Sequence, residues 1–140
     1  MDNAILETLN MDGAKLLQVL ITLFVAILFL QSGIDKVINW KGEKAYYADH
    51  FKKTFLKDLV PMLMPVITIS ELLAGICCGI GLFTLLFNDN VNLGFLGMLL
   101  AALSIIQLFF GQRIAKDFGG AATLVPYFLL TIAGLYVYMI

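Results

Sequence analysis

Four long stretches of apolar residues, separated by short polar segments, dominate the sequence. They cover about residues 15–38, 59–87, 91–112 and 119–140. Each is close to or above the roughly 20 residues that an α-helix needs to cross a hydrocarbon core about 30 Å thick. The pattern therefore predicts an all-α integral membrane protein, built as a four-transmembrane-helix bundle in a single membrane domain that uses residues 1–140.

The first apolar stretch differs from a secretory signal peptide. Asp2, Glu7 and Asp12 precede it, where a signal peptide carries basic residues. Its apolar run is also longer than the apolar core of a usual signal. We therefore expect this stretch to be retained as the first transmembrane helix.

The segment 39–58, between the first two stretches, combines lysines with aromatic residues. Tyr47, Phe51 and Phe55 recur every four residues and would share one face of a helix. This pattern predicts a short amphipathic interfacial helix with its aromatic side chains in the lipid and its lysines among the headgroups. The alternative is an ordinary polar linker.

Basic residues are distributed unequally between the two ends of the predicted bundle. If both longer loops lie on one side, that side holds eight of the nine lysines and arginines, and only Lys15 lies on the other. Positively charged loops stay in the cytoplasm, so both termini are expected on the opposite, periplasmic side. The eight residues are Lys36, Lys41, Lys44, Lys52, Lys53, Lys57, Arg113 and Lys116.

Composition and isolated residues narrow the function classes. With 61% hydrophobic residues, 14% charged residues and a net charge of −1, the chain lacks the basic character that binds nucleic acid. Cys77 and Cys78 are adjacent, which suits neither a metal site nor an ordinary disulfide. His50 is the only histidine, so the chain alone offers no pair of histidines for haem. We expect no metal site and no intrinsic cofactor.

Glu71 is the most informative residue in the sequence. It lies about 12 residues into the second apolar stretch, which is about 18 Å along a helix. A carboxyl group at this depth costs at least a few kcal/mol on insertion scales, so it should face the bundle and be paired or protonated. Two interpretations remain open: a catalytic carboxyl that is proton-handling, quinone-facing or ligand-facing, or a protonated group that hydrogen-bonds a neighbouring helix as structural glue.

Other polar residues near the predicted cytoplasmic ends are candidate partners of Glu71. Residues four apart share a helical face, so Gln31 and Asp35 would point the same way. The functional interpretation is a polar, cofactor-binding pocket that opens to the cytoplasm, and the alternative is that the charged residues simply lie among the headgroups. The candidate pocket residues are Gln31, Asp35, Lys36, Gln107 and Arg113.

Small residues follow Glu71 along the same stretch. Gly75 and Gly79 form a G-x-x-x-G step, and glycines at this spacing let two helix backbones approach closely in lipid. We expect this step to be a helix-packing face.

Two short motifs resemble those of the DoxX-like family of small four-helix bacterial membrane proteins. One is S-G-x-x-K at the end of the first stretch, with Ser32, Gly33 and Lys36; the other is E-L-x-x-G, with Glu71 and Gly75. The resemblance extends over nearly the whole chain. It implies a multi-pass protein of the bacterial inner membrane, working as a small subunit beside a redox partner and linked to quinone.

Three hypotheses of function follow from these features. The first is an accessory subunit of a bacterial inner-membrane complex, redox- or quinone-linked and not catalytic on its own, with Glu71 at its centre. The second is a purely structural or assembly subunit of a large membrane complex, without chemistry of its own. The expected partner is a larger membrane protein complex or, in a homo-oligomer, further copies of the chain. The third, a transporter component, is disfavoured because four helices with one buried carboxyl leave little room for a pathway.

Overall fold

The computed structural model describes residues 3–140 and contains six α-helices and no strand within that range. Four of the helices are long and apolar enough to cross a membrane, which confirms the predicted four-helix fold class and makes the chain a multi-pass membrane protein. Their ends lie within two residues of the predicted bounds. In order, the helices are α1 (Ala4–Leu9), α2 (Gly13–Ile38), α3 (Trp40–His50), α4 (Val60–Asn88), α5 (Asn92–Ile114) and α6 (Phe118–Met139).

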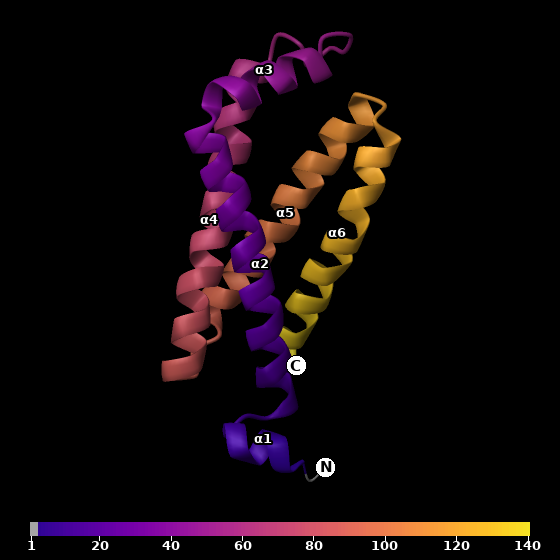
Figure 1. Ribbon diagram of the computed structural model, residues 1–140. Helices are drawn as coiled ribbons and strands as arrows, with labels where there is room; N and C mark the ends of the chain where they lie inside the picture. The colour runs from indigo at the N-terminus through magenta and orange to yellow at the C-terminus, as the bar shows by residue number, and fades with distance from the viewer. Residues whose placement is uncertain (1–2) are drawn as a thin grey trace.

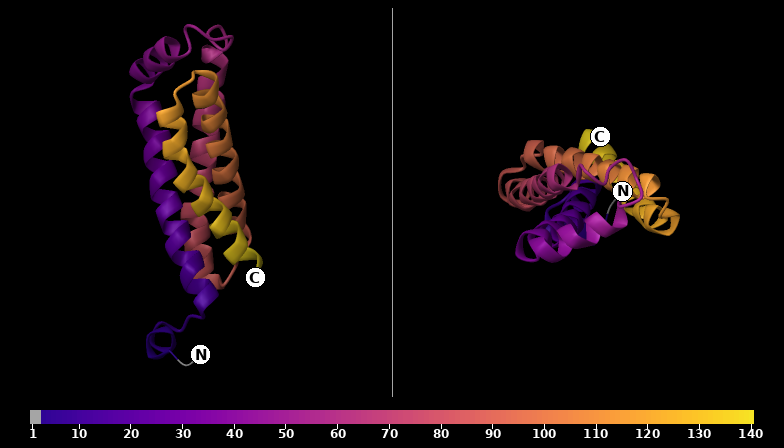
Figure 2. Two further views of the ribbon diagram at one scale, coloured as in Figure 1. Left: turned by 90° about the vertical axis from the view of Figure 1, so that its right-hand side faces the viewer. Right: turned by 90° about the horizontal axis from the view of Figure 1, so that it is seen from above.

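The four long helices lie side by side and form an elongated bundle (Figures 1 and 2). Helix α4 packs against both α2 and α5, and α6 packs against α5 and α2. Helix α1 and the C-terminus lie at one end, whereas α3 and the turn between α5 and α6 lie at the other (Figure 1). The two loops that carry most of the basic residues therefore share one end of the bundle.

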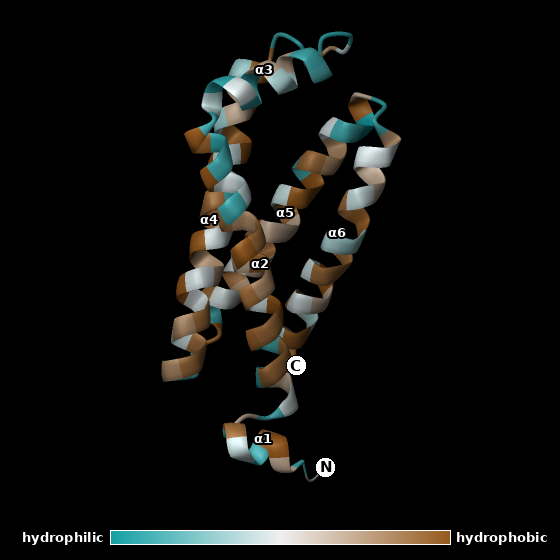
Figure 3. Cartoon of the chain, viewed as in Figure 1, coloured by the Kyte–Doolittle hydropathy of each residue, from teal (hydrophilic) through white to brown (hydrophobic). Residues whose placement is uncertain are grey.

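Apolar residues cover the outer surface of the long helices as well as their interior. Large side chains such as Ile27, Ile69 and Leu129 are more than half exposed. Figure 3 shows brown, hydrophobic residues along the lengths of the helices, and teal, hydrophilic residues concentrated in the loops around α3 and in the turn between α5 and α6. Lipid is the solvent that suits such a belt, because water would be in contact with far more apolar surface than a soluble domain leaves exposed.

Glycines allow close helix contacts, but mainly at a different place from the one predicted. Between α4 and α5, a Cβ added at Gly81 would lie 2.6 Å from the backbone nitrogen of Gly94. Gly75 does face α2, where an added Cβ would lie 2.8 Å from the Leu30 nitrogen. Gly79, the second half of the predicted step, would meet only the end of the Leu30 side chain at 3.9 Å. Of the predicted G-x-x-x-G step, therefore, only Gly75 belongs to a helix-packing face.

The helix predicted between the first two apolar stretches is present as α3, but its aromatic residues do not share one lipid-facing side. Helix α3 ends at His50, and the Thr54 hydroxyl donates to the Phe51 carbonyl as the chain turns towards α4. Phe51 is buried, whereas Phe55 is 68% exposed. The four-residue helical spacing does not continue past Phe51, because the chain must reverse direction within nine residues to enter α4. Phe51 packs instead against a cluster that consists of Leu56, Val60 and Met64.

Candidate functional site

Glu71 lies inside the bundle and forms an ion pair with α2. Its side chain is 1% exposed, and the Lys36 Nζ atom lies 3.0 Å from its Oε2 atom. The Ser32 hydroxyl donates to the same oxygen over 2.8 Å, and Lys36 donates to the Ser32 hydroxyl over 3.0 Å. We call these three residues the ion-pair centre. Glu71 thus faces the bundle and is paired, as an ionisable group in a membrane segment must be.

The local sequence explains why the ion-pair centre forms. Ser32 and Lys36 are four residues apart and therefore share one face of α2. Glycines on both helices bring this face close to α4: a Cβ added at Gly33 would lie 2.6 Å from the side chain of Leu72, and Gly75 touches the backbone of α2. Close approach lets the Lys36 side chain reach Glu71 without leaving the interior.

Two charges buried in this way depend on each other. Taking each charge out of water costs several kcal/mol, which their attraction and the added hydrogen bonds must offset. Removal of one partner leaves the other charged and desolvated, so Lys36 and Glu71 behave as a unit. The pair links α2 and α4, which favours a structural contribution in addition to any chemistry.

The larger polar pocket predicted around Glu71 does not form. Of the other five candidates, only Lys36 reaches Glu71, and it is buried and not among the headgroup lysines. Gln31 and Asp35 are exposed, because each precedes a residue of the ion-pair centre by one position and points about 100° away around the helix. Arg113 is also exposed, with its guanidinium 4.5 Å from the centre of the Phe118 ring.

Gln107, the last predicted pocket residue, belongs to a separate polar contact between α4 and α5. Its Nε2 atom donates to the Ser70 hydroxyl over 3.3 Å, and the Ser70 and Ser104 hydroxyls lie 2.7 Å apart. The predicted pocket did not include this contact. The available signal was the spacing of Ser104 and Gln107, which lie three residues apart in an apolar helix and so share a face.

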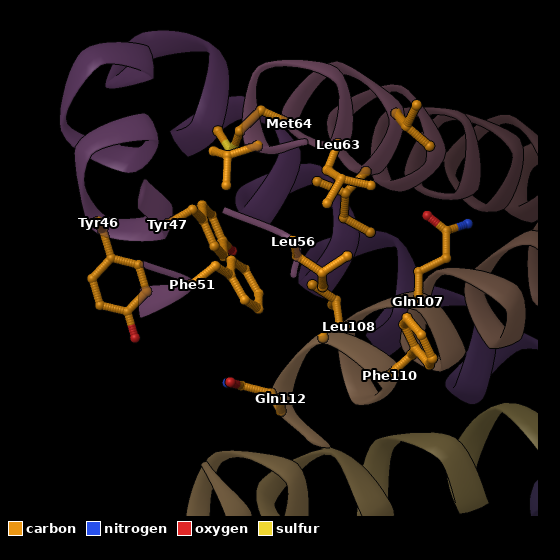
Figure 4. A pocket seen from close by; sticks show the side chains of 14 residues that line it. Tyr46, Tyr47, Phe51, Leu56, Leu63, Met64, Gln107, Leu108, Phe110 and Gln112 are labelled. Carbon is orange, nitrogen blue, oxygen red and sulfur yellow. The ribbon is translucent and has the colours of Figure 1, made fainter. Parts of the chain in front are cut away.

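A cavity of about 380 Å³ lies between α3, the segment that follows it, α4 and α5. Figure 4 shows Tyr47 and Phe51 on one side of this cavity and Gln107 and Phe110 on the other. At its polar rim, the His50 Nε2 atom lies 2.6 Å from the Oε1 atom of Gln112. No sequence pattern predicts this cavity, because it arises where α3 folds back over the ends of two helices. The lining residues are Tyr46, Tyr47, Phe51, Leu56, Val60, Leu63, Met64, Val66, Ile67, Gln107, Leu108, Phe110, Gly111 and Gln112.

Both cysteines are free thiols on α4, with Cys78 buried and Cys77 half-buried. Within residues 3–140, no cluster of three or more histidine, cysteine, aspartate or glutamate residues is placed to hold a metal ion. Comparison of the chain with models of protein families, with curated proteins and with solved structures gives no match. The ion-pair centre and the cavity are therefore the two candidate functional sites of the chain.

Proposed function

We propose that the chain is a small DoxX-like accessory subunit of a redox- or quinone-linked complex in the bacterial inner membrane. One observation carries this proposal: the residues of the two sequence motifs meet in space. Ser32 and Lys36 of the S-G-x-x-K motif contact Glu71 of the E-L-x-x-G motif. Motifs about 40 residues apart that build one buried site are better explained by a shared role than by coincidence in apolar sequence.

The ion-pair centre offers chemistry suited to such a subunit. A carboxylate and an ammonium group, joined through a hydroxyl, provide a proton donor and acceptor inside the hydrocarbon region, where few side chains supply either. A partner would supply the redox centre.

A second candidate, a purely structural or assembly subunit, is favoured by the same ion pair in its role as a link between α2 and α4. In this case the centre orders the two helices, and the partner docks on helix faces. The two candidates differ in whether the charges themselves are needed once the bundle is stable.

Gentle purification tests the proposal. A tagged chain, extracted from bacterial membranes in a mild detergent, is expected to co-purify with subunits of a redox enzyme, identified by mass spectrometry. An unrelated tagged four-helix membrane protein, treated in parallel, controls for non-specific association. Recovery of the chain as a lone species, with the control's background and nothing more, contradicts an accessory role.

The proposed orientation places α3 and the turn between α5 and α6 in the cytoplasm, and both termini in the periplasm. Its support is that seven exposed basic residues lie at the α3 end of the bundle. Lys36, the eighth basic residue predicted there, is not counted because it is buried and paired with Glu71. Alkaline phosphatase fused after Ile140 should be active, because it folds only in the periplasm, and a green fluorescent protein fused there should be dark. A bright fluorescent fusion with an inactive phosphatase fusion would reverse the orientation.

A further inference from the structure

The cavity beside α3 has the size and walls of a small-molecule site. Its volume of about 380 Å³ is within the usual range for ligand pockets, about 300–1,000 Å³. One wall carries the rings of Tyr47 and Phe51, whose planes differ by only 10° with their centroids 6.2 Å apart. Flat rings in near-parallel array favour a flat, apolar guest, because offset stacking needs parallel planes.

The lining also favours an uncharged guest over a charged one. None of the lining residues carries a charged side chain. A phosphate or carboxylate placed there would lose its hydration without gaining a cationic partner, which is strongly unfavourable in an apolar site. The cavity therefore suits a neutral molecule and disfavours a lipid headgroup.

Hydrogen-bonding groups are present at two separated positions in the cavity. The Tyr47 hydroxyl lies on one side and the Gln107 amide on the other (Figure 4). The Gln107 amide has two N–H groups, so it can donate to a guest while it donates to the Ser70 hydroxyl. Burial, followed by the negative charge of Glu71, raises the pKa of Tyr47, so its hydroxyl stays a proton donor. A ring compound with acceptor oxygens would satisfy such donors.

The cavity is open to the lipid-facing surface of the bundle. Val66 on α4 and Phe110 on α5, both lining residues, are 50% and 55% exposed within the apolar belt. A guest dissolved in the bilayer can therefore reach the cavity from its lipid-facing side without crossing water.

We propose that this cavity binds the ring of a neutral, membrane-soluble compound with carbonyl oxygens, of the quinone class. The inference rests on the proposed function for the redox role of the ligand, and it adds the site: Tyr47 and Phe51 hold the ring, and Tyr47 and Gln107 contact its oxygens.

Trp40, the only tryptophan, provides a direct readout because it packs against the cluster that includes Phe51 and Met64. The purified chain in lipid nanodiscs is titrated with decylubiquinone, and quenching of Trp40 fluorescence is recorded. We expect saturable quenching beyond the linear background of quinone dissolved in lipid.

Matched glycine variants locate the binding. In Gly111→Leu, the new side chain enters the cavity beside the Phe51 ring, which lies 3.2 Å from the added Cβ. This substitution should abolish the saturable quenching of Trp40. In Gly119→Leu, the nearest group to the added Cβ is 3.9 Å away, so quenching should be unchanged. Tyr47→Phe keeps the ring and should weaken binding by about three- to tenfold, the worth of one hydrogen bond.

Three results would overturn the inference. They are the same quenching in wild type and Gly111→Leu, an unchanged Kd in Tyr47→Phe, and equal competition by decanol, which would indicate a site for an alkyl chain. If Gly111→Leu fails to fold, as judged by circular dichroism, Tyr47→Phe decides. Because the titration uses the chain alone, failure here leaves the co-purification result untouched, and the reverse also holds.

Discussion

Substitution of Glu71 by glutamine is expected to lower the free energy of unfolding by about 3–5 kcal/mol, because it leaves the Lys36 ammonium buried without its counter-charge. Lys36→Met should cost a similar amount for the converse reason. The measurement is an SDS or thermal unfolding curve of each variant in mixed micelles. In the double variant, both charges are gone and the hydroxyl of Ser32 can still bond the glutamine, so most of the stability should return.

Asp35→Asn is the matched control, since Asp35 precedes Lys36 on the same helix but is exposed. It should shift stability by no more than about 0.5 kcal/mol. A loss of similar size in Asp35→Asn and Glu71→Gln, or additive losses in the double variant, would contradict coupling between Lys36 and Glu71.

The double variant also separates the two candidate functions. Its bundle is expected to be stable but its centre holds no ionisable group. If the partner complex assembles and remains inactive, the charges themselves have a chemical role. If assembly and activity both return with stability, the ion-pair centre is structural and the second candidate is correct.

The sequence predicted the four spanning helices because their signal is long and local. Twenty or more apolar residues have few alternatives in lipid, and the observed ends fall within two residues of expectation. Glu71 was also identifiable, since a carboxyl in such a run is costly wherever the helix is placed. The shared face of Ser32 and Lys36 follows from their spacing.

Which of the other polar residues reach Glu71 depends on how the helices are rotated against one another. A helix turns by about 100° per residue, so Asp35 points away while its neighbour Lys36 pairs with Glu71. Rotation is set by the glycine contacts, which a list of residues does not rank. The cavity likewise depends on α3 ending at His50 and on Phe51 turning inward, a choice made by tertiary packing and not by the four-residue spacing of the aromatics.

Two nearby glycines of α4 differ in the opposite sense from the sequence pattern, which placed Gly79 and not Gly81 on a packing face. Gly81→Val is expected to cost about 3 kcal/mol or more, since its Cβ would lie 2.6 Å from the backbone nitrogen and 2.7 Å from the Cα of Gly94. Backbone atoms cannot rotate away as a flexible side chain can. The only relief is to separate α4 from α5.

Gly79→Val, two residues earlier on the same helix, is the matched control. Its Cβ would meet a single side-chain methyl at 3.9 Å, an ordinary contact, so we expect a change below about 1 kcal/mol. The measurement is the yield of monodisperse protein by size-exclusion chromatography, together with unfolding curves for both variants. Equal yields and stabilities would show that α4 and α5 adjust to one another. Unequal ones would identify the contact between Gly81 and Gly94 as one that α4 and α5 cannot replace by adjusting to one another.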